Sequence, residues 1–245
     1  MRTILLGLAL ALALPASSWA SIQVGQSVQF SRGANQGSGG GVFNATSPSN
    51  AYAAFQTFCV ELTEHISFGS TYYVYNIGTT NNLGGKTLGS TTAWLYTQFR
   101  EGDIALGSAN AENAMQLGIW RGMGYTDNEI ASTMNGHSNW GSTANALSTY
   151  IPLLDGILTN WFTTLSADFA AWQSHGANYI GGVRIINISS SLTPRSGTYA
   201  QDQLIWNPVP DPEPGTVPEP MTLAVWGGLG LCGAAIAYRN KRRSV

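Results

Sequence analysis

Charge is scarce in this chain of 245 residues: charged residues make up only 10% of it, and the formal net charge at pH 7 is −2. Five of the eleven basic residues lie at the two ends, which leaves six basic and thirteen acidic residues between positions 21 and 220, a formal charge of −7. A surface that binds nucleic acid needs clustered lysine and arginine to neutralise phosphates. The composition therefore excludes nucleic acid as a partner.

Cysteine and histidine are also scarce, with two cysteines and three histidines in the chain. They are scattered without the spacing of a chelating motif, which argues against a metal site. The glycine run at 39–41 is not followed by a helix that carries a lysine, so a phosphate-binding loop is not predicted either. We therefore expect no metal and no cofactor.

Hydrophobic residues, in contrast, make up 44% of the chain, enough for a sizeable core. Residues 1–20 have the pattern of a secretory signal peptide: Arg2 provides the positive start, 4–14 the apolar run, and Ser18-Trp19-Ala20 a cleavage site. The apolar run is too short to span a bilayer. The sequence predicts that the remaining chain is exported.

The C-terminal end has three parts in order. Residues 208–220 form a proline-rich linker that ends in Val217-Pro218-Glu219-Pro220, and the tail 221–245 consists of an apolar span, 221–238, and a basic end. This arrangement resembles the PEP-CTERM sorting signal. The resemblance implies transient insertion into the inner membrane, recognition by an exosortase-type transpeptidase, and delivery to the surface or extracellular matrix of a Gram-negative bacterium. A simple C-terminal membrane anchor is the alternative.

Between these ends the hydrophobic pattern changes its period twice. Strands are predicted at 21–30, near 42–43, and at 71–76, 183–188 and 199–206, with an apolar segment at 55–62. Helices are predicted to end near Glu101-Gly102, to run from Ser108 or Asn110 to about Trp120, to cover 127–134, and to fill 143–173 with an interruption around Pro152. This order indicates an α+β domain over 21–207, in which a mainly antiparallel, β-sandwich or barrel-like sheet carries a helical insertion.

Cys59 is the only cysteine of the exported body, because Cys232 lies in the apolar span and is not expected to pair with it. An unpaired thiol is unusual in an oxidising compartment. Farther along, Gln116 lies inside an apolar helical run. The segments Phe58-Cys59-Val60-Glu61 and Met115-Gln116-Leu117-Gly118-Ile119-Trp120 together resemble the two motifs of bacterial surface thioester domains, with Gly118 where that family more usually has alanine.

The resemblance implies that the side chains of Cys59 and Gln116 form an internal thioester with release of ammonia. A fold that holds the sulfur against the amide carbon supplies the effective concentration that this reaction lacks in solution. An amine on a surface or matrix target, most simply a lysine, then attacks the Gln116 carbonyl and becomes covalently attached. Such capture is used once and does not turn over, so we expect an adhesin-like protein and not an enzyme.

Several neighbouring residues are candidates to assist. Glu61 and His65 could transfer protons, although solvated surface positions are the more ordinary interpretation of both. Four aromatic side chains are candidates to keep water away from the thioester: Phe58, Tyr72, Tyr73 and Trp120.

Other interpretations remain open. Cys59 alone could be a small buried apolar residue, and Gln116 an ordinary polar helix position. A cysteine protease would need an orienting Asn or Asp in a recognisable setting, which the sequence does not offer. The principal alternative is a structural or carbohydrate-binding matrix protein whose tryptophan and tyrosine side chains stack on sugars.

Overall fold

The computed structural model describes residues 22–35, 40–134 and 146–206. The chain divides into two compact units, Met1–Asn207 and Pro208–Val245. The predicted signal peptide, linker, sorting motif and apolar span lie outside the described residues, and their assignments stay predictions.

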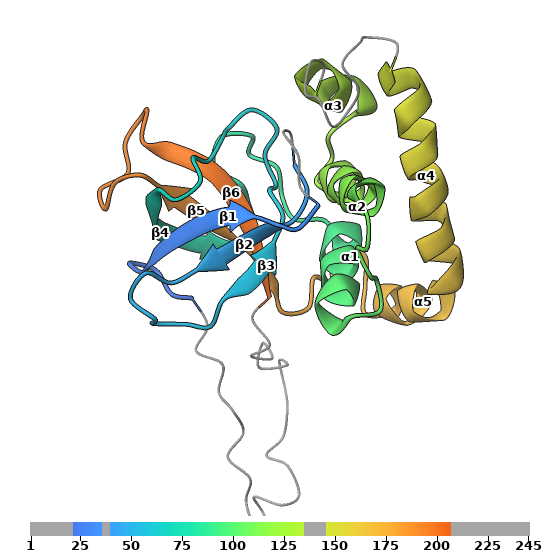
Figure 1. The fold of residues 1–245 in the computed structure, drawn as a ribbon. Coiled ribbons are helices and arrows are strands. Elements are labelled where there is room, and N and C mark those ends of the chain that lie inside the picture. The colour runs from blue at the N-terminus through green and yellow to red at the C-terminus, as the bar shows by residue number, and fades with distance from the viewer. Residues whose placement is uncertain (1–21, 36–39, 135–145, 207–245) are drawn as a thin grey trace, which may run out of the picture. The chain divides into compact units, whose positions relative to one another are not determined.

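The first unit is built on a six-stranded sheet in which every neighbouring pair is antiparallel (Figure 1). The strand order is β3-β2-β1-β4-β5-β6. The strands are β1 Ser27–Arg32, β2 Phe43–Thr46, β3 Phe55–Thr57, β4 Thr71–Gly78, β5 Val183–Ser189 and β6 Tyr199–Trp206.

All five helices of the described chain lie between β4 and β5 in sequence, which confirms the predicted α+β fold with a helical insertion. They are α1 Ser90–Glu101, α2 Ala109–Gly122, α3 Asp127–Met134, α4 Ala146–Thr164 and α5 Ser166–Ser174. The helices α1 and α2 lie next to the sheet, and α4 packs on their outer side (Figure 1). The Ser108 hydroxyl accepts the Ala111 N–H and caps α2, whereas Gly102 ends α1 in the left-handed region at φ 92°.

The two outermost strands of the sheet approach each other just after β3. Cys59 forms an isolated antiparallel bridge with Gln203 of β6. The Val60 N–H donates to the Asp202 carbonyl at 3.0 Å, and the Leu204 N–H donates to the Phe58 carbonyl at 3.0 Å. The sheet is therefore barrel-like at this corner, but it is not a closed barrel.

Two local predictions are wrong. The first strand begins at Ser27 and not at position 21, because Gly25, at φ +89°, turns the chain and leaves Val24 exposed. The helix α4 is not interrupted at Pro152 but runs through it. Proline removes one helical hydrogen bond, but Pro152 is exposed, and the buried Leu154 and Leu158 anchor the inner face of the helix.

Successive side chains of the segment after β3 point in opposite directions, into two separate hydrophobic clusters of the core. Cys59 belongs to the cluster that contains Leu117 and Trp120 of α2. Its neighbours Phe58 and Val60 point the other way, into a cluster with α1.

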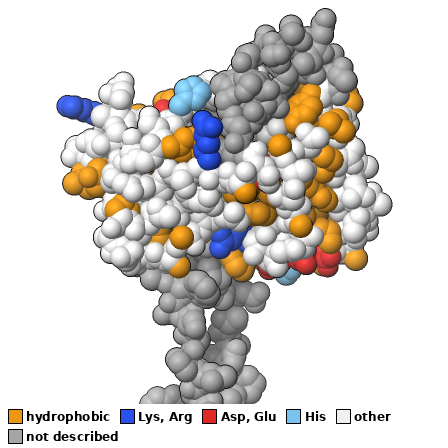
Figure 2. Space-filling view, viewed as in Figure 1, with side chains coloured by type: hydrophobic (Ala, Val, Ile, Leu, Met, Phe, Trp, Pro, Cys, Tyr) orange, Lys and Arg blue, Asp and Glu red, His pale blue; other side chains and the backbone are white. Residues whose placement is uncertain are grey.

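The described surface carries few charges, and apolar atoms follow the helical side of the molecule (Figure 2). Within 22–35, 40–134 and 146–206, no helix has the length and apolar character needed to cross a bilayer.

Candidate functional site

The structure brings Cys59 and Gln116 into direct contact, although 57 positions separate them in the sequence. The Cys59 thiol donates to Gln116 Oε1 with an Sγ–Oε1 distance of 3.3 Å, and Gln116 Nε2 donates to the Cys59 carbonyl oxygen at 2.8 Å. The second bond fixes the plane of the carboxamide. Both the oxygen and the nitrogen of the Gln116 carboxamide are therefore held next to Cys59.

Two different elements position this pair. The bridge to β6 fixes the backbone of Cys59, and the capped helix α2 carries Gln116. Both side chains are almost fully buried, with 1% of Cys59 and none of Gln116 exposed to solvent. Neither side chain is open to bulk solvent.

A glycine-rich backbone covers the carboxamide of Gln116. The Gly41 N–H points at Gln116 Oε1 from 3.4 Å, which is long for a hydrogen bond. A Cβ at Gly40 would lie only 2.9 Å from Gln116 Cγ and 3.3 Å from the Trp120 ring, and Gly40 has φ +124°. Only glycine permits this close approach.

Glu112 fastens the covering backbone to α2. One carboxylate oxygen accepts the Asn35 N–H and the other accepts the Val42 N–H, both at 3.3 Å. Glu112 precedes Gln116 by four residues, so the two side chains lie on the same face of the helix. Glu112 thus holds the backbone that presents Gly41 to the carboxamide.

The thiol of Cys59 is held in its neutral form. Burial raises the pKa of this thiol well above its usual range, and the nearby Glu61 carboxylate raises it further. Hydrogen bonding from the backbone and from the Trp120 side chain lowers the thiol pKa, but by less than burial raises it. The sulfur is therefore a hydrogen-bond donor in the resting protein, not a free thiolate.

Glu61 is not the solvated surface residue that the sequence favoured, because only 1% of it is exposed. Its two carboxylate oxygens accept the N–H groups of Leu83 and Asp202, each at 3.0 Å. With both oxygens engaged, Glu61 joins the chain after β3 to β6. We find no contact between its carboxylate and Gln116 in the described part of the chain.

Two further carboxyl groups surround Glu61. Burial raises the pKa of Glu64 to about 8; a hydrogen bond that its protonated carboxyl donates to Glu61, and the negative charges of Glu61 and Asp202, add to the rise. Burial and the charge of Glu61 raise the pKa of Asp202 to about 7. Asp202 accepts hydrogen bonds from the backbone of Asn82 and Ile188. The hydrogen bonds of Glu61 and Asp202 link the segment after β3 to the loop at 82–83, to β5 and to β6.

The remaining predicted site residues separate into two groups. Trp120 and Tyr72 share the cluster of Cys59, whereas Phe58 lies in the other cluster and makes an edge contact with Phe99. Tyr73 is only half-buried and points away from Tyr72. His65 is exposed, as the ordinary interpretation of that residue has it.

Sequence reasoning missed three parts of the site. The first is the glycine run around Gly40, which the sequence suggests only as a phosphate-binding loop that lacks its lysine. The second is Glu112. The third is Gln203, opposite Cys59. A signal existed for the last two: Glu112 lies one helical turn before Gln116, and the strand predicted at 199–206 carries three successive polar residues at 201–203, all of which the structure buries.

Comparison with models of protein families, with curated proteins and with solved structures found no match for this chain.

Proposed function

We propose that this protein is an exported surface or matrix protein that forms a Cys59–Gln116 thioester and uses it to capture an amine on a target. The observation that carries the proposal is the contact between the two side chains, with Sγ and Oε1 3.3 Å apart in a buried site. The export signal and the sorting tail, if they act as predicted, would place this chemistry outside the cell.

Formation of the thioester is an acyl transfer within the chain. The Cys59 sulfur attacks Cδ of Gln116, the C–N bond to Nε2 breaks, and the thiol proton leaves with the nitrogen as ammonia. Negative charge develops on Oε1 in the transition state, where the Gly41 N–H is in place to stabilise it. The Cys59 carbonyl, 2.8 Å from Nε2, orients the leaving group.

Capture runs the same chemistry with a new nucleophile. The target amine bonds to Cδ of Gln116, the C–S bond breaks, and the proton lost by the nitrogen goes to the sulfur. The raised pKa of Cys59 favours a protonated sulfur in the product, so the proton transfer accompanies bond cleavage. The burial of both residues slows hydrolysis while the thioester waits.

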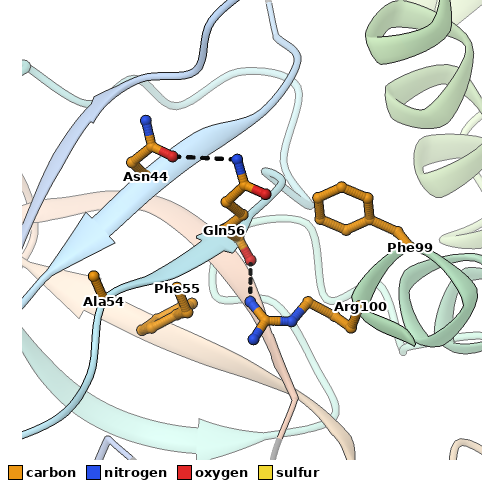
Figure 3. Close-up of a pocket in the computed structure, with 6 residues that line it drawn as sticks. All are labelled: Asn44, Ala54, Phe55, Gln56, Phe99 and Arg100. Atoms are coloured by element: carbon orange, nitrogen blue, oxygen red, sulfur yellow. Dashed lines mark hydrogen bonds between the residues drawn. The ribbon is translucent and has the colours of Figure 1, made fainter. Parts of the chain in front are cut away.

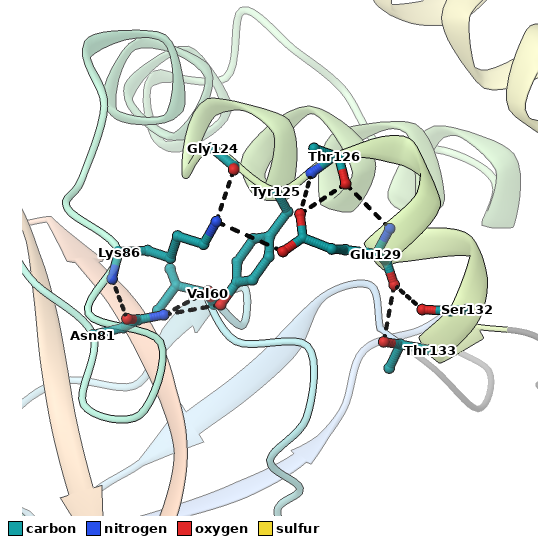
Figure 4. A network of polar contacts seen from close by, with 9 residues as sticks. All are labelled: Val60, Asn81, Lys86, Gly124, Tyr125, Thr126, Glu129, Ser132 and Thr133. Atoms are coloured by element: carbon teal, nitrogen blue, oxygen red, sulfur yellow. Dashed lines mark hydrogen bonds and ion pairs between the residues drawn. The ribbon is translucent and has the colours of Figure 1, made fainter.

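The body itself offers little competition for the thioester, because Lys86 is the only lysine between positions 21 and 220. Its ammonium donates to the Gly124 carbonyl at 2.9 Å, lies 4.6 Å from the centre of the Tyr125 ring, and is 3.9 Å from the Glu129 carboxylate (Figure 4). These contacts hold the amine in place. The nucleophile therefore comes from another molecule.

The test is incubation of the purified body, residues 21–207, with methylamine. We expect one methylamine to be incorporated, with the modification at Gln116 when the peptides are sequenced by mass spectrometry. Gln116→Glu, which has no ammonia to release, and Cys59→Ala should incorporate none, whereas Gln98→Glu, a change at another buried helical glutamine, is the matched control. Incorporation that persists in Cys59→Ala would contradict the proposal.

One observation favours the alternative of sugar binding. An open pocket of about 500 Å³ lies between β3 and the end of α1, with the rings of Phe55 and Phe99 and the guanidinium of Arg100 among its walls (Figure 3). Aromatic faces and guanidinium N–H groups suit a sugar ring and its hydroxyls. Cys59→Ala separates the two functions, because it would keep sugar binding and lose amine capture.

A further inference from the structure

Gln203 lies directly across from Cys59, on β6. The hydrogen bonds on either side of the bridge, from Val60 to Asp202 and from Leu204 to Phe58, make this a non-hydrogen-bonded pair. At such a pair the Cα atoms are about 4.5 Å apart and the side chains point to the same face. The side chain of Gln203 is therefore a neighbour of the Cys59 sulfur.

The face of β6 that carries Gln203 looks towards α2. Ile205, two residues farther along the strand, belongs to the same core cluster as Cys59, Leu117 and Trp120. Residues two apart on a strand share a face. Gln203 thus faces the site that contains Gln116.

The carboxamide of Gln203 is only half satisfied. The residue is fully buried, and its Nε2 donates to the Gln201 carbonyl at 3.1 Å. Its Oε1 has no hydrogen-bond partner within the described chain. A buried carbonyl oxygen left without a partner destabilises the fold, so an unpartnered oxygen on the side chain opposite Cys59 indicates a group that arrives later.

We propose that Gln203 Oε1 accepts an N–H of the attacking amine and positions it at the Gln116 carbonyl. This inference rests on the proposed thioester. As the nitrogen bonds to Cδ it becomes positively charged, and the bond to Oε1 strengthens until the proton passes to the Cys59 sulfur.

The arrangement also selects the class of amine. The attacking nitrogen of a primary amine carries two N–H groups, which can meet Gln203 Oε1 and the Cys59 carbonyl that holds Nε2 in the resting protein. A secondary amine has only one. The substrate is therefore a primary amine, such as the end of a lysine side chain.

The experiment compares methylamine with dimethylamine on purified body that already carries the thioester, followed by intact mass. Gln203→Met removes the acceptor at similar length, and Gln203→Glu restores an oxygen. Gln201→Met is the control, because Gln201 lies on the same strand as Gln203 but its side chain donates to the Glu61 carbonyl. We expect Gln203→Met to slow methylamine capture at least about tenfold, to slow dimethylamine capture much less, and to be rescued in Gln203→Glu.

Other results overturn the inference in distinguishable ways. If Gln203→Met captures methylamine at the wild-type rate, or loses the same factor for both amines, Gln203 has no positioning role although the thioester stands. If Gln203→Met forms no thioester, Gln203→Glu decides, and a tenfold loss of methylamine capture in that variant refutes the role. If the wild-type protein lacks the thioester, the proposed function fails, and this inference fails with it.

Discussion

Gly40, in the backbone that covers Gln116, is the position of the site that places the strictest limit on side-chain size. Gly40 combines a positive φ with a contact that any Cβ would violate, 2.9 Å from Gln116 Cγ. Its role is to bring the Gly41 N–H to the carboxamide oxygen without pushing the carboxamide away from the sulfur.

Gly40→Ala is therefore expected to reduce the fraction of protein that carries the thioester, because the added methyl displaces the Gln116 side chain. The measurement is the intact mass of freshly purified protein. Gly25→Ala is the control: Gly25 also has a positive φ, but a Cβ there meets no atom within 4 Å. Both variants should lose about 1–2 kcal/mol of stability to the backbone conformation. Equal thioester fractions in the two would show that the cover is not needed.

At this scale the sequence predicted the contact between Cys59 and Gln116 and little of its surroundings. Cys59 and Gln116 stood out because each is unusual in its own segment. The contacts of Glu61 and Glu112 with backbone N–H groups depend on which loops the fold brings to them, and local pattern carries no such information. The cover at Gly40 depends in the same way on a crossing with α2 that only the tertiary structure creates.

At the scale of elements, α2 is the helix on which the site depends, and Gly118 sets how closely its neighbours pack. A Cβ at Gly118 would lie 2.8 Å from Leu95 Cδ1 of α1 and 2.9 Å from Leu158 Cδ2 of α4. This explains why glycine, a poor helix former, is tolerated inside α2. Glycine lets two leucines pack against the backbone.

We expect Gly118→Ala to lower the free energy of unfolding by about 1 kcal/mol, since overpacking outweighs the gain in helix propensity. Gly156→Ala is the matched change in α4, where a Cβ meets no atom within 4 Å, and it should raise stability by up to about 1 kcal/mol. Urea unfolding of both variants measures the difference. A Gly118→Ala protein as stable as Gly156→Ala would refute this packing account.

The order and type of most elements could be predicted, because strands and helices differ in hydrophobic period. The failures have local causes. A turn at Gly25 shortened the first strand, and burial of Leu154 and Leu158 overrode the effect of Pro152. The pairing of the chain after β3 with β6 joins segments more than a hundred residues apart, so no sequence window contains it.

The carboxyl cluster of Glu61, Glu64 and Asp202, where the segment after β3 meets β6, predicts how stability varies with pH. Glu64 and Asp202 have pKa values raised to about 8 and about 7, so each binds its proton more tightly in the folded protein than in the unfolded chain. Stability from such groups is complete below the unfolded pKa of about 4 and is lost as the pH rises through the folded values. We therefore expect the Tm to fall from about pH 5 to pH 8.

Glu64→Gln should flatten this decline, because the amide keeps a hydrogen-bond donor and does not titrate. Glu129→Gln is the control: the pKa of Glu129 is lowered, so its loss leaves the slope between these pH values unchanged. Thermal unfolding followed by circular dichroism gives the Tm values. A Tm that stays constant or rises over this range would contradict the cluster as described.

At the scale of the whole molecule, the described body is a lightly charged α+β unit (Figures 1 and 2). Cys59 and Gln116 are buried where the chain after β3 meets α2. If the proposed thioester forms, burial would protect it from water, and Lys86, the one lysine between positions 21 and 220, is already held by other groups. Both features suit a reagent that must last until it meets its target.

The intact mass of the purified body under denaturing conditions tests the central claim most directly. We predict a mass lower than that of the sequence by one ammonia, and the full sequence mass in Cys59→Ala. A wild-type protein of full mass, with an intact Gln116 carboxamide and a Cys59 thiol that is alkylated at once after unfolding, would contradict the account.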